Sequence, residues 1–269
     1  MNINEMTPRD KALHMFYLGD SIGAMAEGGA GGSCSYEKAM KGIKAFPRGT
    51  DESDTARLFL SYIEQCGRPQ AAADIASWYH YHQANRNVSR YGRTWRDHFG
   101  LVKELEKKGR LTYKAVYQIS VDRNSLGNGG LMLVFPAIMT GVDFATLLAI
   151  IKGTHYQAEP IAAMLYRLLK RYVSVSVVEE SLTTHYCLFH DDYGMTPLAP
   201  YCLLAAIQVA KQPTIEEAVR FSLEKGGDVD SYLSLGLLLW AYLGDLLGDR
   251  NSEKQTDVFL GTYIDVSKQ

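Results

Sequence analysis

Apolar residues recur at three- and four-residue intervals along almost the whole of this 269-residue chain. Such spacing places them on one face of an α-helix, and that face can be buried against other helices. The segments with this spacing are 11–26, 54–64, 70–81, 99–107, 113–120, 130–139, 144–151, 157–171, 198–209, 215–224 and 229–247. Only 173–178 (VSVSVV) alternates β-branched residues as a strand does, and helical patterns flank it. The sequence therefore predicts an all-α, multi-helix protein that forms one compact domain over residues 1–269.

The charge balance narrows the classes of partner. The 28 Lys and Arg residues nearly match the 30 Asp and Glu residues, so the formal net charge is only -2. Proteins that bind nucleic acid or anionic membranes rely on a surplus of cations, and we expect neither partner. The most apolar segment, 232–247, is shorter than the roughly 20 residues of a membrane span. Residues 1–10 lack the pattern of a secretory signal, so we expect a cytoplasmic protein. No feature of the sequence indicates an oligomeric state.

Two acidic clusters stand at the starts of predicted helices. In the segment 226–231 (GGDVDS), Asp228 and Asp230 can point at one hard cation, and Ser231 adds a neutral oxygen. The segment 50–55 (TDESDT) is a second such cluster. Because one hard cation takes about six oxygen ligands, two clusters that meet in space would form a site economically. The alternative is that each cluster simply caps its own helix, as Asp, Ser and Thr often do.

A carboxylate beside a glycine-rich loop is a candidate catalyst. Glu27 immediately precedes the sequence GGAGG (28–32), whose backbone is free to move. On such a hinge a carboxylate can act as a general base or acid, although an exposed residue at a helix end is the simpler explanation. Asp20, inside the preceding apolar helix, is expected to cap a neighbouring backbone segment instead.

Two further features suit an anionic ligand. The segment 124–130 (NSLGNGG) leads into an apolar helix, and free backbone N–H groups at a helix start can bind phosphate. His155 lies between two apolar helices, where a hydrogen-bonded structural role is the commoner explanation. The sequence contains no nucleophile elbow, Walker loop or dinucleotide fingerprint, so serine hydrolases, P-loop NTPases and dehydrogenases are disfavoured.

Taken in order, these segments resemble the motifs of the ADP-ribosylglycohydrolase family, which includes the ADP-ribosyl-acceptor hydrolases and the dinitrogenase reductase-activating glycohydrolase. The resemblance covers roughly residues 12–248. The matching segments are Gly19, Asp20, Gly23 and Glu27 near the N-terminus, then Glu52 to Thr55, Gly127 to Gly129 with Pro136, Thr154-His155, and finally Gly226 to Ser231.

The resemblance implies a Mg²⁺-dependent hydrolase, with two ions, that cleaves N- or O-linked ADP-ribose from a modified protein or other acceptor at the anomeric carbon. It implies that Glu27 is catalytic. The metal ligands it implies are Ser53, Asp54, Asp228, Asp230 and Ser231. The ADP-ribose ligands it implies are Gly127, Asn128, Gly129, Gly130 and His155.

The chain departs from the family pattern at two places. Glu52 and Ser53 stand where members have Thr and Asp, so one cation site is expected to be altered. A shifted alignment on 50–52 restores an acidic pair but displaces the following apolar helix, and we prefer the unshifted one. Leu133 stands where many members have Arg. Two alternatives to hydrolysis therefore stay open: a lyase that releases ADP-ribose by elimination, and a catalytically silent ADP-ribose-binding protein.

Overall fold

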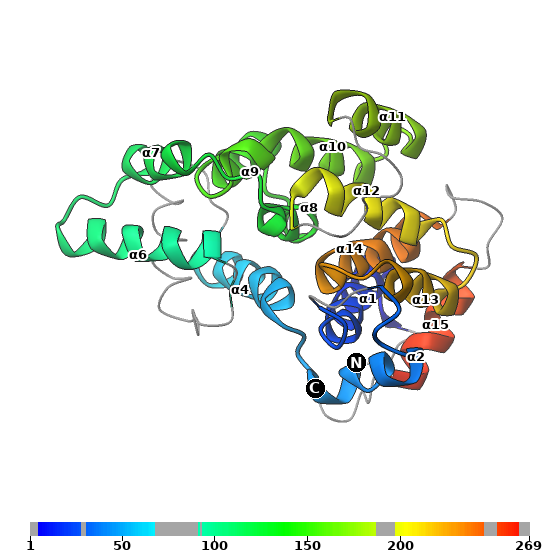
Figure 1. The fold of residues 1–269 in the computed structure, drawn as a ribbon. Coiled ribbons are helices and arrows are strands. Elements are labelled where there is room, and N and C mark those ends of the chain that lie inside the picture. The colour runs from blue at the N-terminus through cyan, green and yellow to red at the C-terminus, as the bar shows by residue number, and fades with distance from the viewer. Residues whose placement is uncertain are drawn as a thin grey trace. The chain divides into compact units, whose positions relative to one another are not determined.

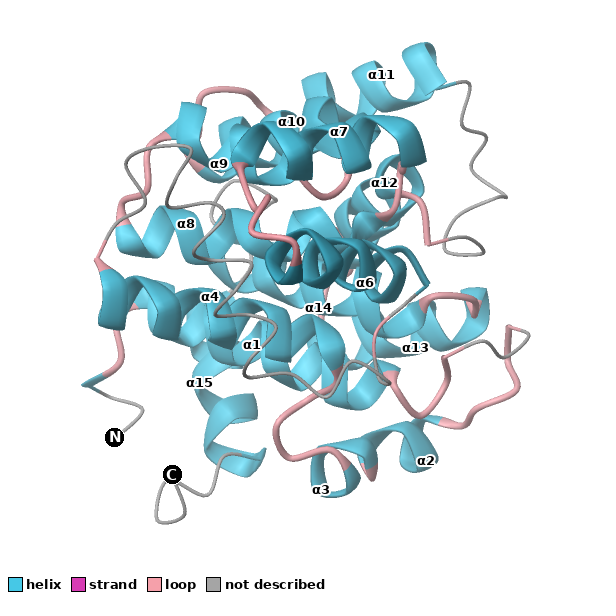
Figure 2. Ribbon diagram, turned by 90° about the vertical axis from the view of Figure 1, so that its left-hand side faces the viewer, coloured by secondary structure: helices cyan, strands magenta, loops and turns pink. Residues whose placement is uncertain are grey.

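Helices and their connecting turns make up the structure. The computed structural model describes residues 5–27, 31–67, 91, 93–186, 197–244 and 252–263, and no strand occurs among them (Figure 2). The all-α prediction is therefore confirmed. None of the described helices combines the length and hydrophobicity that crossing a membrane requires.

Residue contacts divide the chain into two compact units. Unit 1 comprises Met1–Ser53 and Leu168–Gln269, and unit 2 comprises Asp54–Arg167. The helices of unit 1 are α1 (Pro8–Gly23), α2 (Tyr36–Met40), α3 (Gly42–Ala45), α11 (Val175–Tyr186), α12 (Ala199–Ala210), α13 (Ile215–Lys225), α14 (Val229–Tyr242) and α15 (Ser252–Tyr263) (Figure 1). Those of unit 2 are α6 (Arg93–Lys107), α7 (Tyr113–Arg123), η3 (Asn128–Leu133), α8 (Val134–Thr140), α9 (Phe144–Lys152) and η4 (Tyr156–Ala158).

Two helices cross the boundaries between the units. They are α4 (Asp51–Cys66) and α10 (Glu159–Leu169). The first three residues of α4 belong to unit 1 and its remainder belongs to unit 2. The single domain expected over residues 1–269 stays a prediction.

Most expected segments are helices whose ends differ by a few residues from the prediction. Segment 130–139 begins as the 3₁₀ helix η3 before α8, segment 229–247 ends as α14 at Tyr242, and segment 70–81 lies outside the described residues. The periodicity did not predict α2 and α3, which are very short, or α15.

The strand-like run 173–178 is not a strand. Its residues from Val175 onward form the first turn of α11. Ser174 precedes the helix and its Oγ accepts a hydrogen bond from Val177 N at 3.4 Å, in the manner of an N-cap. Val178 and Leu182 are buried on one face of α11, so helical packing overrides the preference of β-branched residues for strands.

Helices α1 and α14 approach each other very closely in unit 1 (Figure 1). A Cβ atom built on Gly19 would lie 2.7 Å from Ser234 Cα, and one built on Gly23 would lie 2.3 Å from Asp230 Cα. These two glycines are four residues apart and therefore share a face of α1. Their missing side chains bring Asp20 beside the first turn of α14.

Replacing Gly23 with Ala should destabilise unit 1. The added methyl would meet the backbone of Asp230, which cannot move aside without displacing α14. Overpacking of this kind costs about 1–3 kcal/mol of unfolding free energy. Gly100→Ala is the control, because Gly100 lies in α6 and a Cβ there meets nothing within 4 Å. Thermal denaturation should show a lowered Tm for Gly23→Ala alone, and equal Tm values would contradict the close approach.

Candidate functional site

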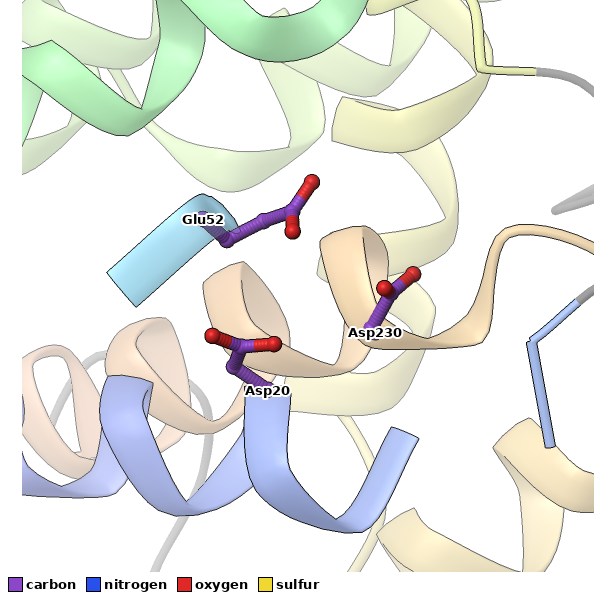
Figure 3. Close-up of side chains that lie close together, drawn as sticks. All are labelled: Asp20, Glu52 and Asp230. Atoms are coloured by element: carbon purple, nitrogen blue, oxygen red, sulfur yellow. The ribbon is translucent and has the colours of Figure 1, made fainter. Parts of the chain in front are cut away.

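Unit 1 contains two groups of carboxylates that share a member. Within each group, one oxygen from every residue lies within 4.8 Å of the others. The first group is Asp20, Glu52 and Asp230, all buried, from three different helices (Figure 3). The second is Glu27, Asp228 and Asp230. Carboxylate oxygens gathered in this way could hold a hard cation.

The turn before α14 places Asp228 and Asp230. Gly226 and Gly227 have φ angles of 72° and 78°, a region that favours glycine. The Tyr232 hydroxyl donates to the carbonyl oxygens of Ser222 at 2.7 Å and Gly226 at 3.0 Å, which fastens this turn to the end of α13. Asp228 is the N-cap residue of α14, yet its side chain makes no capping hydrogen bond. Capping therefore does not account for the Asp228 carboxylate.

From the start of α4, Glu52 enters the first group. Its Oε1 atom accepts a hydrogen bond from Ser231 Oγ at 2.7 Å. Of the other expected ligands, Ser53 donates its backbone N–H to Asp20 Oδ2 at 3.0 Å, and Asp54 belongs to unit 2 and to neither carboxylate group. The helix begins at Asp51, three residues before the expected start, so residues 51–53 form its first turn. Of the acidic pair in the shifted alignment on residues 50–52, Glu52 belongs to a carboxylate group and Asp51 does not.

Burial and the repulsion between neighbouring negative charges disfavour the ionised form of these carboxylates. Burial, followed by the negative charges of neighbouring carboxylates, raises the pKa of Glu52 and of Asp230 well above the ordinary value. The same causes raise the pKa of Asp51 to about 6. In the described part of the chain, none of Asp20, Glu52 and Asp230 forms an ion pair with Lys, Arg or His. A buried, uncompensated set of oxygen ligands fits a hard divalent cation.

Metal dependence of the Tm should grow with pH. A carboxyl group whose pKa is raised on folding, as those of Glu52 and Asp230 are, stabilises the fold below its unfolded pKa, and that contribution is lost as pH rises through the raised folded pKa. A divalent cation binds the deprotonated groups and offsets the loss. We expect the difference in Tm between Mg²⁺ and EDTA to be larger at pH 8 than at pH 5, by at least about 3 °C. Equal differences would contradict a cation site at these carboxylates.

Glu27 stands at the end of the turn that follows α1. It is exposed, whereas Asp230 in the same group is buried. Partial desolvation, then the charges of Asp228 and Asp20, raise the pKa of Glu27. Residues 28–30 of the glycine-rich loop lie outside the described residues. Beyond them, Gly32 N donates to the Leu223 carbonyl oxygen at 2.8 Å, so the described end of the loop is fixed to α13.

In unit 2 the predicted ADP-ribose ligands come together around His155. A Cβ atom on Gly127 would lie 3.2 Å from His155 Cδ2, and one on Gly129 would lie 3.2 Å from His155 Nε2. Gly130 is equally crowded by Ile151 Cγ2 at 3.2 Å. The glycines therefore allow the backbone of this segment to pack directly against the imidazole, which is buried. Asn128, between them, is buried as well.

The sequence analysis missed Trp95, which packs against this segment. Its ring centroid lies 4.8 Å from that of His155 in an edge-on arrangement, and it stacks on Phe99 at 5.1 Å. A Cβ atom on Gly129 would lie 2.4 Å from Trp95 Nε1. Trp95 precedes the segment 99–107 in which helical periodicity was recognised, so no sequence pattern pointed to it.

Comparison with known proteins shows that the fold of this chain is similar to that of a solved structure. No family model and no curated protein matches the chain. A solved structure described as an ADP-ribosylglycohydrolase-related protein complex matches it with a TM-score of 0.61 and 20% sequence identity, over 95% of this chain and 98% of that chain. The chain has an ADP-ribosylglycohydrolase-like fold. The resemblance inferred from the order of the motifs is thus confirmed at the level of the fold.

Proposed function

We propose that the chain is a Mg²⁺-dependent hydrolase that removes ADP-ribose from a modified protein or small-molecule acceptor. The observation that carries the proposal is the pair of carboxylate groups sharing Asp230, in a chain with an ADP-ribosylglycohydrolase-like fold. Other helical folds also hold carboxylates, but two groups with a common member, together with this fold, favour a two-cation hydrolase.

The cations would be held by residues of unit 1. Glu52 and Asp230 belong to the first group, and Glu27, Asp228 and Asp230 form the second. Ser231, whose Oγ lies 2.7 Å from Glu52, adds a neutral oxygen. In this proposal the cation ligand from α4 is Glu52, and not Ser53 or Asp54 as the resemblance implied. When bound, the cations supply Lewis-acid stabilisation of the charge that develops as the glycosidic bond breaks.

Glu27 is proposed as the general base or acid. An oxocarbenium-like centre needs either an activated water or a protonated leaving group, and a carboxylate performs both tasks in glycoside hydrolysis. Glu27 is the exposed carboxylate of the second group, so it can reach a water molecule or an acceptor. Its raised pKa lies closer to neutral pH than that of an ordinary glutamate, which suits proton transfer.

Residues of unit 2 are proposed to bind ADP-ribose. The ligands are Gly127, Asn128, Gly129, Gly130 and His155. The glycines at the start of η3 carry no side chain of their own, and backbone N–H groups at a helix start suit phosphate oxygens. Leu133, where many members of the family have Arg, is fully buried in the core of this chain. The side chain at this position therefore packs in the core and does not contact the ligand.

Product mass decides the reaction. Peptides ADP-ribosylated on arginine and on serine would be incubated with the protein in Mg²⁺ or in EDTA, and the products weighed by mass spectrometry. We expect intact ADP-ribose in Mg²⁺ and none in EDTA. A product lighter by one water would establish elimination instead. Binding of ADP-ribose without any release would establish a silent binding protein.

A further inference from the structure

The N-terminus of α4 is capped by a residue from another helix. Asp20, in α1, accepts hydrogen bonds at Oδ2 from Thr50 N at 2.6 Å and from Ser53 N at 3.0 Å. Its Oδ1 accepts from the Thr50 hydroxyl at 2.5 Å. The first N–H groups of a helix have no partner inside the helix, and a carboxylate that accepts from them stabilises the helix start. Asp20 thus caps a neighbouring backbone, as the sequence analysis expected.

The neighbouring segment holds Asp20 in this orientation. Gly49 has a φ of 71°, and a Cβ atom there would lie 2.3 Å from Asp20 Oδ2 and 2.1 Å from Ser53 Oγ. The Ser21 hydroxyl, next to Asp20 in α1, donates to the Phe46 carbonyl oxygen at 2.7 Å. The chain from Phe46 to Ser53 is therefore fastened to α1 at both ends, and Asp20 is completely buried.

The cap is connected directly to the proposed cation ligand. The Thr50 hydroxyl that donates to Asp20 also lies 3.3 Å from Glu52 Oε2. The other oxygen of Glu52 accepts from Ser231 Oγ at 2.7 Å. Two of the donors to Asp20 are backbone N–H groups, which are fixed at the helix start, whereas the donors to Glu52 are the Thr50 and Ser231 hydroxyls, which can turn away when a cation binds.

We propose that Asp20 is a positioning residue that sets Glu52 through the start of α4, and that it is not itself a cation ligand. The inference rests on the proposed function, because Glu52 is taken to hold a cation. It assigns the three carboxylates of the first group different tasks. Asp20 fixes the backbone, and Glu52 and Asp230 coordinate.

Two substitutions of Asp20 separate positioning from coordination. Asp20→Asn retains one oxygen that can accept from both N–H groups, and its NH₂ group can donate to the Thr50 hydroxyl, which turns to accept. Asp20→Ala removes the cap. The readout is the affinity for Mn²⁺, measured by calorimetry. We expect Asp20→Asn to bind within about threefold of the unaltered protein and Asp20→Ala at least about tenfold more weakly. An Asn variant that loses as much affinity as the Ala variant, or an Ala variant that loses none, would overturn the proposal.

The Tm measured in EDTA tests the capping role of Asp20 in the absence of a bound cation. A carboxylate that served only as a ligand would repel its neighbours, so both substitutions would raise the Tm above that of the unaltered protein. A cap predicts instead that Asp20→Ala melts at least about 2 °C below Asp20→Asn. This comparison also decides the capping role if Asp20→Ala folds poorly, since the Asn variant then remains folded. Absence of Mn²⁺ binding in the unaltered protein would refute the proposed function, whereas equal Tm values of the two variants would refute the cap.

Discussion

Replacing Glu27 with Gln should lower the rate of ADP-ribose release by about 100- to 10,000-fold, the range of general acid–base catalysis. Gln cannot exchange a proton with water or with the acceptor, although it has nearly the same shape. The binding of ADP-ribose should change much less, because the residues proposed to bind it belong to unit 2 and Glu27 belongs to unit 1. Single-turnover rates and ADP-ribose titrations, measured on the same preparation, test this difference.

Glu37→Gln is the matched control for Glu27→Gln. Glu37 is an exposed glutamate of α2 in the same unit and belongs to neither carboxylate group. Its substitution should leave the release rate unaltered. If Glu27→Gln retained more than about a tenth of the rate, general acid–base catalysis by this residue would be refuted. If the rate loss were matched by lost ADP-ribose affinity, Glu27 would be a binding residue instead.

Replacing Asp230 with Asn should impair cation binding at both proposed positions, whereas Asp228→Asn should impair it at one position only. The reason is that Asp230 contributes to both carboxylate groups and Asp228 contributes to the second alone. Loss of a shared ligand should weaken Mg²⁺ binding at both positions by at least about 100-fold, more than the loss of an outer hydrogen-bond partner does. The activity should fall in parallel, and both quantities would be measured over a range of Mg²⁺ concentrations.

Melting curves check that the Asp230 variant is folded. Asp230 is buried among like charges, and Asn can still accept the hydrogen bond that Asp230 Oδ1 accepts from Ser231 N at 2.9 Å. In EDTA, Asp230→Asn should therefore melt at or above the Tm of the unaltered protein, because a desolvated charge has been removed. Identical Mg²⁺ responses of the Asp228 and Asp230 variants would contradict a shared ligand.

The helices could be predicted because their buried apolar residues recur with the regular spacing of one helix face. The apolar spacing located α1, α12 and α14, which pack together in unit 1, to within a few residues, except at the C-terminal end of α14. The same reasoning failed where packing outweighs local preference, as in α11, whose β-branched start is helical because Val178 and Leu182 are buried.

The candidate site was predicted in part. Glu27, Asp228 and Asp230 were named from the sequence, and the structure brings them together. Glu52 was named in the acidic motif but was not chosen as a ligand, because the apolar pattern of α4 starts only after its acidic first turn and favoured a helix start three residues too late. That the Asp20 cap would act on Thr50 and Ser53 was not readable either, because it joins residues about 30 positions apart through a tertiary contact.

The most direct measurement is a calorimetric titration of the metal-free protein with Mn²⁺ or Mg²⁺, beside Asp230→Asn. The proposed site predicts that the unaltered protein binds two ions per chain, and that Asp230→Asn loses binding at both positions. Two ions bound equally well by the Asp230 variant would place the cations elsewhere. No binding by the unaltered protein would contradict the metal centre and, with it, the proposed hydrolase.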